Sequence, residues 1–325
     1  MPAVAHQYSG ILTAGPPDQD VVALPQALLV VYSLDIQHEA LGIMRFNDFA
    51  VKKTELGKLP GETITFTRYG NITRGGQLME HEDIAMQTMS ASTNTLDVTE
   101  YGNAIGLTEK MLQLSFDDML AEAAVLLGRD YAIVKDLAER DALINNLTNS
   151  HFAGGRAAAA NLLATDFFDI ELLRVAVETL QTQNVPKFMG DFYVCFVHPH
   201  QVAYIKRDPD WQAANNYANT RALFNGELGR FEDTIFIGTT HMRNGAAAAT
   251  TPGEAAALQN AGADGQHLYE ALIFGDSCLA CATGLEPEMR ESGVIDFGRK
   301  HGIAWYSIEG FDLLYDNYGA ILTTS

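Results

Sequence analysis

Three cysteines and one histidine are the first residues whose spacing suggests chemistry. Cys195 and His198 stand three apart, as do Cys278 and Cys281, which is a spacing found in zinc sites with four ligands. Both pairs lie in apolar runs that predict strands, however, and residues three apart on a strand point to opposite faces of a sheet. We therefore favour buried structural thiols over a metal site. For His198-Pro199-His200 we likewise favour a corner between a strand and a helix over a pair of metal ligands.

A serine further on has the neighbours of a hydrolase nucleophile. The run Gly275-Asp276-Ser277-Cys278-Leu279 imitates the nucleophile block of GDSL-type hydrolases, in which a later histidine activates the serine. The only histidine after Ser277 is His301, and it lacks the aspartate three residues before it that such hydrolases use. A strand that ends in a turn explains these residues better, so the sequence predicts no catalytic residue.

The elements that would hold these residues form an α/β lobe between about Asp166 and Thr240. Apolar residues at helical spacing predict one amphipathic helix, and short apolar runs predict buried strands around it. The predicted elements are a helix at Asp166–Gln183, a strand at Phe192–Val197, a helix at Gln201–Ile205 and a strand at Thr234–Ile237.

The C-terminal part of the chain predicts a second group of strands. Residues Asn244 to Gly265 are rich in Ala, Gly and Thr, which is typical of a surface loop. Strands follow at Leu268–Leu279, Ile303–Ser307 and Asp312–Tyr315. These strands would have to pack, from the far end of the sequence, against a long helix in the middle of the chain.

That long helix is predicted over Phe116–Leu147. Its apolar residues recur at helical spacing without a proline, and its length would be roughly 50 Å at 1.5 Å per residue. Thr108 can cap a short turn before it, and Ser115 followed by Asp118 resembles a capping box. The charged residues are expected to fill the wetter face of the helix, and they are Asp130, Lys135, Asp136, Glu139 and Arg140.

A projecting hairpin is predicted before the helix. A turn at Lys58–Gly61 opens the alternating run Glu62–Tyr69, and a second alternating run returns over Thr95–Tyr101. The stretch between them, His81 to Asn94, is polar and rich in Met. A hairpin of this kind is marginal in water by itself, so we expect it to lie on another surface and to be no part of the subunit core.

The N-terminal residues predict an arm without a core of its own. Met1 to about Gln26 contains prolines and glycines among small polar residues, and a short helix is predicted from Ala27 to about His38. Such an arm needs a partner to become ordered.

Composition restricts the class of protein. The 325 residues are 47% hydrophobic and 19% charged, which is typical of a globular chain with a sizeable core. The sequence contains no apolar run of about 18 residues and no signal peptide, and it has only three cysteines, so we expect a cytoplasmic protein. A formal net charge of −20 argues against tight binding of nucleic acid by the bulk surface.

Several segments in this order resemble a known family. They are Gly57–Gly70, Tyr101-Gly102 followed by Leu107-Thr108, Val197-His198-Pro199 and Gly229-Arg230-Phe231. In these residues the chain resembles major capsid proteins of tailed bacteriophages with the Hong Kong 97 fold. Within that fold it is similar to the group named for the major capsid protein of coliphage N-four.

The resemblance implies an α+β fold with named parts. These are an N-terminal arm at 1–50, an E-loop hairpin region at 51–106, a P-domain spine helix at 107–165, an A-domain at 166–267 and closing strands at 268–325. It also implies which residues act in assembly through the E-loop and which belong to the spine helix. In the E-loop they are Ile64, Phe66, Arg68, Tyr69, Leu96 and Val98, and in the spine helix they are Leu120, Leu127, Val134 and Leu137.

The resemblance implies a shell protein without enzymatic activity, cofactor or metal. Hexamers and pentamers of the chain would form an icosahedral head around double-stranded DNA, without sequence-specific binding and without a membrane. Expected partners are a portal protein, a scaffold and a cement or decoration protein, with assembly in the bacterial host cytoplasm and a final place in the virion. Two alternatives stay open: the shell of an encapsulin-like nanocompartment, and a GDSL-like or zinc-dependent hydrolase.

Overall fold

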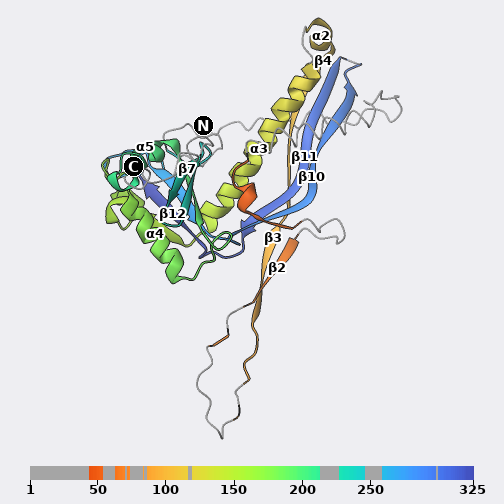
Figure 1. Cartoon of the computed structure of the whole chain (residues 1–325). Helices are drawn as coiled ribbons and strands as arrows, with labels where there is room; N and C mark the ends of the chain where they lie inside the picture. The colour runs from red at the N-terminus through yellow and green to blue at the C-terminus, as the bar shows by residue number, and fades with distance from the viewer. Residues whose placement is uncertain are drawn as a thin grey trace, which may run out of the picture.

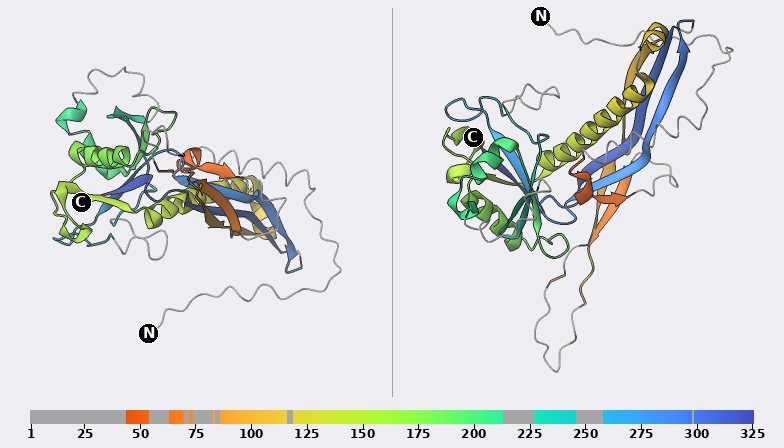
Figure 2. Two further views of the ribbon diagram at one scale, coloured as in Figure 1. Left: turned by 90° about the horizontal axis from the view of Figure 1, so that it is seen from below. Right: turned by 45° about the horizontal axis from the view of Figure 1, so that its top comes forward.

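The computed structural model divides into a compact lobe and an elongated lobe, with a hairpin projecting from the elongated lobe (Figure 1). Helix α3 and two long strands run along the elongated lobe, and one end of the helix reaches the compact lobe (Figure 2). The structure describes residues 44–53, 63–69, 72–73, 83, 86–115, 119–212, 227–245, 258–297 and 299–325. The predicted arm, the predicted helix Ala27–His38 and the predicted turn Lys58–Gly61 lie outside these residues.

The predicted long helix is confirmed. Helix α3 spans Met119–Asn146, which is 28 residues or about 42 Å. A separate short helix, α2, spans Glu109–Leu114, and its N-cap is Thr108, whose Oγ1 accepts a hydrogen bond from the amide of Met111 as predicted. Ser115 of the predicted capping box is the C-cap of α2, and residues 116–118, which complete the box, lie outside the described part.

A four-stranded sheet lies beside α3 in the elongated lobe. Its strand order is β1-β10-β11-β4, and it is antiparallel except for the parallel pair β1 and β10. The strands span Val51–Lys53 (β1), Thr99–Thr108 (β4), Leu279–Ile295 (β10) and Lys300–Leu313 (β11). Because β10 and β11 come from the end of the chain, the prediction of a late sheet packed on the long helix is confirmed.

The core between α3 and this sheet is built around Leu127, Tyr131 and Trp305. All three side chains are buried, and the Tyr131 and Trp305 rings meet edge to face with centroids 5.2 Å apart. The Trp305 indole Nε1 donates to Asp130 Oδ2 at 2.9 Å, so its polar atom is satisfied as well.

The compact lobe contains a six-stranded sheet in the order β5-β12-β9-β6-β8-β7. Helix α4 spans Ile170–Thr182 and helix α5 spans Pro199–Ile205. The strands span Asn149–Phe152 (β5), Tyr193–Val197 (β6), Glu227–Phe231 (β7), Thr234–Gly238 (β8), Tyr269–Phe274 (β9) and Gly319–Thr324 (β12). The predicted α/β lobe is therefore present, with its central strand β6 buried along its whole length.

Three predicted boundaries in these lobes are wrong for local reasons. Helix α4 begins at Ile170 because the Asp169 side chain caps it, accepting from the Leu172 amide at 2.9 Å. The predicted strand Leu268–Leu279 is divided by a turn, in which Ser277 has a φ of 60°. The predicted strand Asp312–Tyr315 contains the last residues of β11 and the start of a turn toward β12.

The loop predicted over Asn244–Gly265 is only partly a surface loop. Leu258 is buried in the core of the compact lobe, and Asn244 forms a β-bridge with Tyr269. Residues 246–257 lie outside the described part.

The predicted hairpin is present with a different second strand. β2 (Thr63–Tyr69) pairs antiparallel with β3 (Ala91–Asp97), and Ile64 lies opposite Leu96. The second strand begins at Ala91, four residues before the predicted start at Thr95, because pairing with β2 extends through a polar stretch that shows no alternation. Residues 99–101 belong to β4 and pair with β11 in the four-stranded sheet.

Candidate functional site

The base of the hairpin is fixed to its own subunit. Leu96 is 2% exposed and packs against Ala280 and Ala282 of β10, with Phe66 and Val98 half-buried at the edge of this contact. The prediction that the hairpin is no part of the subunit core is therefore wrong at its base. Leu96 is an apolar residue on the side of the hairpin that meets the sheet.

A polar bond and a glycine complete this anchor. The Asn94 side-chain amide donates to the carbonyl oxygen of Leu314 at 2.8 Å. Gly310 of β11 lies so close to the hairpin that an added Cβ would be 2.3 Å from Leu96 Cδ2 and 2.5 Å from the Asp97 carbonyl oxygen. The hairpin therefore leaves the subunit in a defined direction.

Beyond the anchor, the hairpin exposes apolar side chains to solvent. Within the described part, β2 and β3 pair only with each other, so the outer edges of this ribbon have no strand partner. The exposed apolar residues are Tyr69 at 61%, Ile72 at 65%, Met86 at 98% and Met89 at 67%. Such a surface is typical of a contact with another molecule.

The remaining predicted E-loop residues lie on the same ribbon. The backbones of Ile64 and Arg68 pair with Leu96 and Ser92, and their side chains are outside the described set. Sequence reasoning missed Asn94, Met86 and Met89, because the stretch that contains them has no strand periodicity.

The predicted spine residues have unequal burial. Leu127 is 1% exposed and belongs to the core of the elongated lobe, whereas Leu120 and Val134 are half-buried at its margin. Leu137 is half-buried as well. These residues hold α3 against its own sheet.

The prediction that the charged residues of α3 fill a solvent-exposed face is wrong. Lys135, Asp136, Glu139 and Arg140 are at most 7% exposed, and Asp130 is half-buried. The sequence predicted solvated charges here, but three segments from elsewhere in the chain cover this face with polar partners. They are β11, the segment before β1 and the loop after β8.

On the side toward β11, an ion pair and a phenol share one carboxylate. Glu309 Oε1 accepts from Lys135 Nζ and from the Tyr131 hydroxyl, each at 2.9 Å. Burial by itself lowers the pKa of Lys135, but Glu309, together with Tyr131, Cys281 and Glu139, outweighs it, so the pKa lies above its ordinary value. Burial, followed by the charge of Glu309, raises the pKa of Tyr131.

On the other side, Asp136 joins three parts of the chain. Its Oδ1 accepts from the backbone amides of Arg45 at 2.7 Å and Phe46 at 2.9 Å, and its Oδ2 lies 2.5 Å from His241 Nδ1. The Arg140 guanidinium donates to the carbonyl oxygen of His241. One carboxylate thus connects the long helix, the segment before β1 and the loop after β8.

The four residues with zinc-site spacing do not converge. Cys195 packs in the cluster under α4, whereas Cys278 belongs to the cluster on the opposite face of the sheet. His198 caps α5, with Nδ1 accepting from the His200 amide and Nε2 3.2 Å from the Asn244 side chain. Burial raises the pKa of Cys281 to about 12, which is typical of an inert thiol.

The serine with hydrolase-like neighbours is far from its only candidate base. Ser277 lies just before the start of β10, and His301 pairs with Val294 near the other end of that strand. At about 3.3 Å per residue, this separation is roughly 50 Å. His301 Nε2 instead lies 3.0 Å from Glu109 Oε2, so Ser277 and His301 do not form a catalytic pair.

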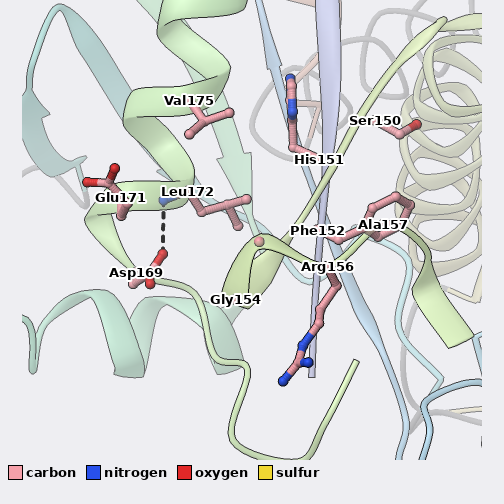
Figure 3. Close-up of a pocket in the computed structure, with 11 residues that line it drawn as sticks. Ser150, His151, Phe152, Gly154, Arg156, Ala157, Asp169, Glu171, Leu172 and Val175 are labelled. Atoms are coloured by element: carbon pink, nitrogen blue, oxygen red, sulfur yellow. Dashed lines mark hydrogen bonds between the residues drawn. The ribbon is translucent and has the colours of Figure 1, made fainter. Parts of the chain in front are cut away.

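A cavity of about 590 Å³ lies between strand β5 and helix α4 (Figure 3). Three of its polar side chains are already engaged: Asp169 caps α4, Arg156 Nε donates to Asp166 at 2.9 Å and His151 bonds to Thr179. In the sheet order β5 is at one end, and among the described strands it pairs only with β12. The cavity is therefore a groove along a sheet edge.

Solved structures of viral shells share this fold. The capsid of Ralstonia phage GP4 matches with a TM-score of 0.66 and 15% identity, over 99% of this chain and 98% of that chain. The capsid of cyanophage Pam1 matches with a TM-score of 0.67 and 15% identity, over 98% and 99%. A virus-like particle from Pyrococcus furiosus matches with a TM-score of 0.52 and 10% identity, over 91% of this chain and 99% of that chain. The fold is the α+β, Hong Kong 97-like fold of shell-forming subunits.

The family follows from the sequence profile. The family described as phage capsid protein matches residues 141–323, which is more than half of the 325-residue chain. The chain belongs to this family, and it is a major capsid protein that forms the icosahedral head of a phage. No curated protein matches the chain. Within the described residues, no helix is long and apolar enough to cross a membrane.

Proposed function

We propose that the hairpin is the E-loop of this capsid protein and that it assembles hexamers and pentamers by lying on a neighbouring subunit. The observation that carries this proposal is the contrast within one ribbon. Leu96 at its base is buried in its own subunit, whereas Met86 and Met89 beyond the anchor are exposed. Their burial is then available to assembly and not to folding, since it requires a second copy.

The other parts receive the matching assignments. The arm is residues 1–50, the E-loop region 51–106, the P-domain with its spine helix 107–165, the A-domain 166–267 and the closing strands 268–325. Heterologous contacts between such subunits close into rings. The similarity of Gly57–Gly70 and Val197-His198-Pro199 to capsid proteins of the group named for coliphage N-four supports placing the chain in that group.

The proposed role is structural and not enzymatic. Within the described residues, Ser277 has no base, the thiols of Cys195 and Cys278 are buried on opposite faces, and the cavity beside β5 has its charges engaged. A net charge of −20 suits a container that encloses double-stranded DNA without holding it by its bulk surface. Portal, scaffold and cement proteins are the expected partners, with assembly in the host cytoplasm.

A hairpin truncation tests the E-loop assignment. Residues 70–90 are replaced by Asn-Gly, which joins the paired residues Tyr69 and Ala91 by a two-residue turn and keeps the Leu96 anchor. We expect a soluble subunit that unfolds cooperatively and forms no shells in sedimentation. Full-sized shells from this variant, or a subunit that no longer folds, would contradict the assignment.

A single charge substitution tests the hairpin contact without removing any residues. Met89→Asp is expected to weaken assembly, because the exposed Met89 side chain would be buried against a neighbour. The matched control is Met189→Asp, since Met189 is 95% exposed in a turn of the compact lobe with a φ of 51° that aspartate tolerates. Equal loss of assembly in both variants would argue against a specific role for the hairpin.

The shell of a protein-filled nanocompartment is the second candidate, because the fold, which a virus-like particle from Pyrococcus furiosus shares at a TM-score of 0.52, does not specify what the shell encloses. The contents of purified particles decide between the two. Double-stranded DNA of uniform length in particles from infected cells supports the phage head, and particles that carry only protein cargo support the compartment.

A further inference from the structure

Glu139 is an acid for which the structure supplies no polar partner. Its side chain is 0% exposed, and within the described part of the chain neither carboxyl oxygen has a hydrogen-bond partner. An ionised carboxylate is strongly disfavoured in such a place, because it loses its water and gains no hydrogen bond. In this arrangement Glu139 therefore carries a proton.

The charged groups around Glu139 are mostly committed elsewhere. On α3 itself, Lys135 bonds to Glu309 of β11, and Asp136 accepts from two backbone amides and pairs with His241. Tyr131 also bonds to Glu309. Lys135 favours ionisation of Glu139 more than any other group does, but its ammonium is already paired with Glu309.

The sheet side contributes one thiol and one cation. Cys281 of β10 interacts electrostatically with Glu139, and burial raises its pKa, so it adds no charge near neutral pH. Lys52 of β1 favours ionisation of Glu139. Among the described residues, Lys52 has no ion pair or hydrogen bond, and its side chain is exposed.

The register of β1 directs Lys52 toward Glu139. β1 pairs in parallel with β10, and Lys52 lies opposite Cys281. Paired residues in neighbouring strands point to the same face of a sheet, and Cys281, at 1% exposed, faces α3. The long, flexible side chain of lysine allows its ammonium group to turn from solvent toward α3 without movement of the strand.

We propose that Lys52 and Glu139 form a two-position charge latch between β1 and the long helix. In the open position Glu139 is protonated and Lys52 extends into water. In the closed position Glu139 has released its proton to solvent, and the Lys52 ammonium has turned inward to pair with the carboxylate. Because β1 precedes the hairpin in the chain, the latch ties the start of the hairpin region to α3.

Assembly favours the closed position. When a neighbouring subunit covers β1, Lys52 loses the water that holds it outside, and a buried carboxylate becomes its best partner. This step rests on the assembly of the chain into shells, whereas opening and closing with pH are properties of the isolated subunit. The two parts are therefore tested separately.

The test in the isolated subunit is the reactivity of Lys52 toward acetic anhydride, measured by mass spectrometry across pH. Lys206, exposed at the end of α5, is the internal reference, so that the general rise of amine reactivity with pH cancels in the ratio. We expect the Lys52 to Lys206 ratio to fall several-fold as Glu139 ionises. In Glu139→Gln, which keeps the size and removes the charge, the ratio is expected to stay constant.

A ratio with the same pH dependence in wild type and Glu139→Gln would overturn the latch. Lys52→Met is the second variant, in case the glutamine disturbs folding: it keeps most of the stem and removes the cation. We expect it to lose stability relative to wild type in urea as pH rises, because an ionised Glu139 then has no partner. A pH-independent difference from wild type would also contradict the proposal.

The shells supply the final comparison. In wild-type shells the Lys52 to Lys206 ratio is expected to be lower than in subunits at the same pH, and in Glu139→Gln shells this further decrease is expected to be smaller. Shells in which both proteins show the same decrease would mean that simple coverage protects Lys52, which overturns the assembly step. Failure to form any shells would contradict the proposed function and leave the result in subunits standing.

Discussion

Asp136 Oδ2 lies 2.5 Å from His241 Nδ1, and this contact joins the long helix to the loop that follows β8. The two residues are 105 positions apart, and the same carboxylate also holds the segment before β1 through two backbone amides. Asp136 is therefore one of the residues that hold the two lobes and the segment before β1 together.

Removing this carboxylate should be costly. Asp136→Ala leaves the amides of Arg45 and Phe46 and the ring of His241 without their acceptor, and we expect a loss of about 3–5 kcal/mol in the free energy of unfolding. Urea denaturation of the isolated subunit measures it. Glu122→Gln, on the exposed part of the same helix, is the control and should change stability by less than about 0.5 kcal/mol. Similar losses in both variants would contradict the role of Asp136.

Glu139 should make stability fall as pH rises. Burial raises its pKa in the folded subunit well above the ordinary 4.5. Below about pH 4.5 Glu139 is protonated in both the folded and the unfolded state. Above pH 4.5 it ionises first in the unfolded state, so the free energy of unfolding of wild type falls by about 1.4 kcal/mol per pH unit until the folded pKa is passed. Relative to wild type, Glu139→Gln should therefore gain stability progressively above about pH 4.5. Urea midpoints between pH 4 and pH 8 check this, and a constant difference would refute it.

Two adjacent leucines on α3 should respond differently to truncation. Leu127 is 1% exposed in the core of the elongated lobe, whereas Leu126 is 54% exposed. We expect Leu127→Ala to cost about 2–5 kcal/mol through the lost packing and the cavity it leaves, and Leu126→Ala to cost under about 0.5 kcal/mol in the subunit. Leu127→Pro should cost about 3 kcal/mol or more by breaking the helix, on top of the lost packing. Equal unfolding free energies for the two alanine variants would contradict the packing described.

The close approach of β11 to the hairpin should tolerate no side chain at Gly310. Gly310→Ala places a Cβ against Leu96 and the Asp97 carbonyl oxygen, so the hairpin base must move, and we expect a cost of about 1–3 kcal/mol together with impaired assembly. Gly106→Ala is the matched control, since an added Cβ there meets nothing within 4 Å in the same sheet. Thermal unfolding and sedimentation of both variants test this. Normal shells from Gly310→Ala would contradict the proposal that the anchor directs the hairpin.

Elements whose signals are local could be predicted from the sequence. Helical spacing without proline gives α3, an apolar run bounded by His198-Pro199 gives β6, and the alternation of Thr63 to Phe66 gives the first hairpin strand. Each of these depends on residues close in the chain, whose periodicity matches the geometry of one element. The family resemblance rests on the same kind of local signature, and the family match confirms its coarser part.

Which surfaces are exposed to solvent could not be predicted, because that depends on tertiary packing. Lys135 and Asp136 have the spacing of a solvated helix face, yet their partners Glu309 and His241 are 174 and 105 residues away and cover that face. Leu96 likewise reads as one residue of a thin ribbon until Ala280 and Ala282 close over it. Periodicity records which residues share a face, but burial depends on which distant segment packs there, and that is decided when the whole chain has folded.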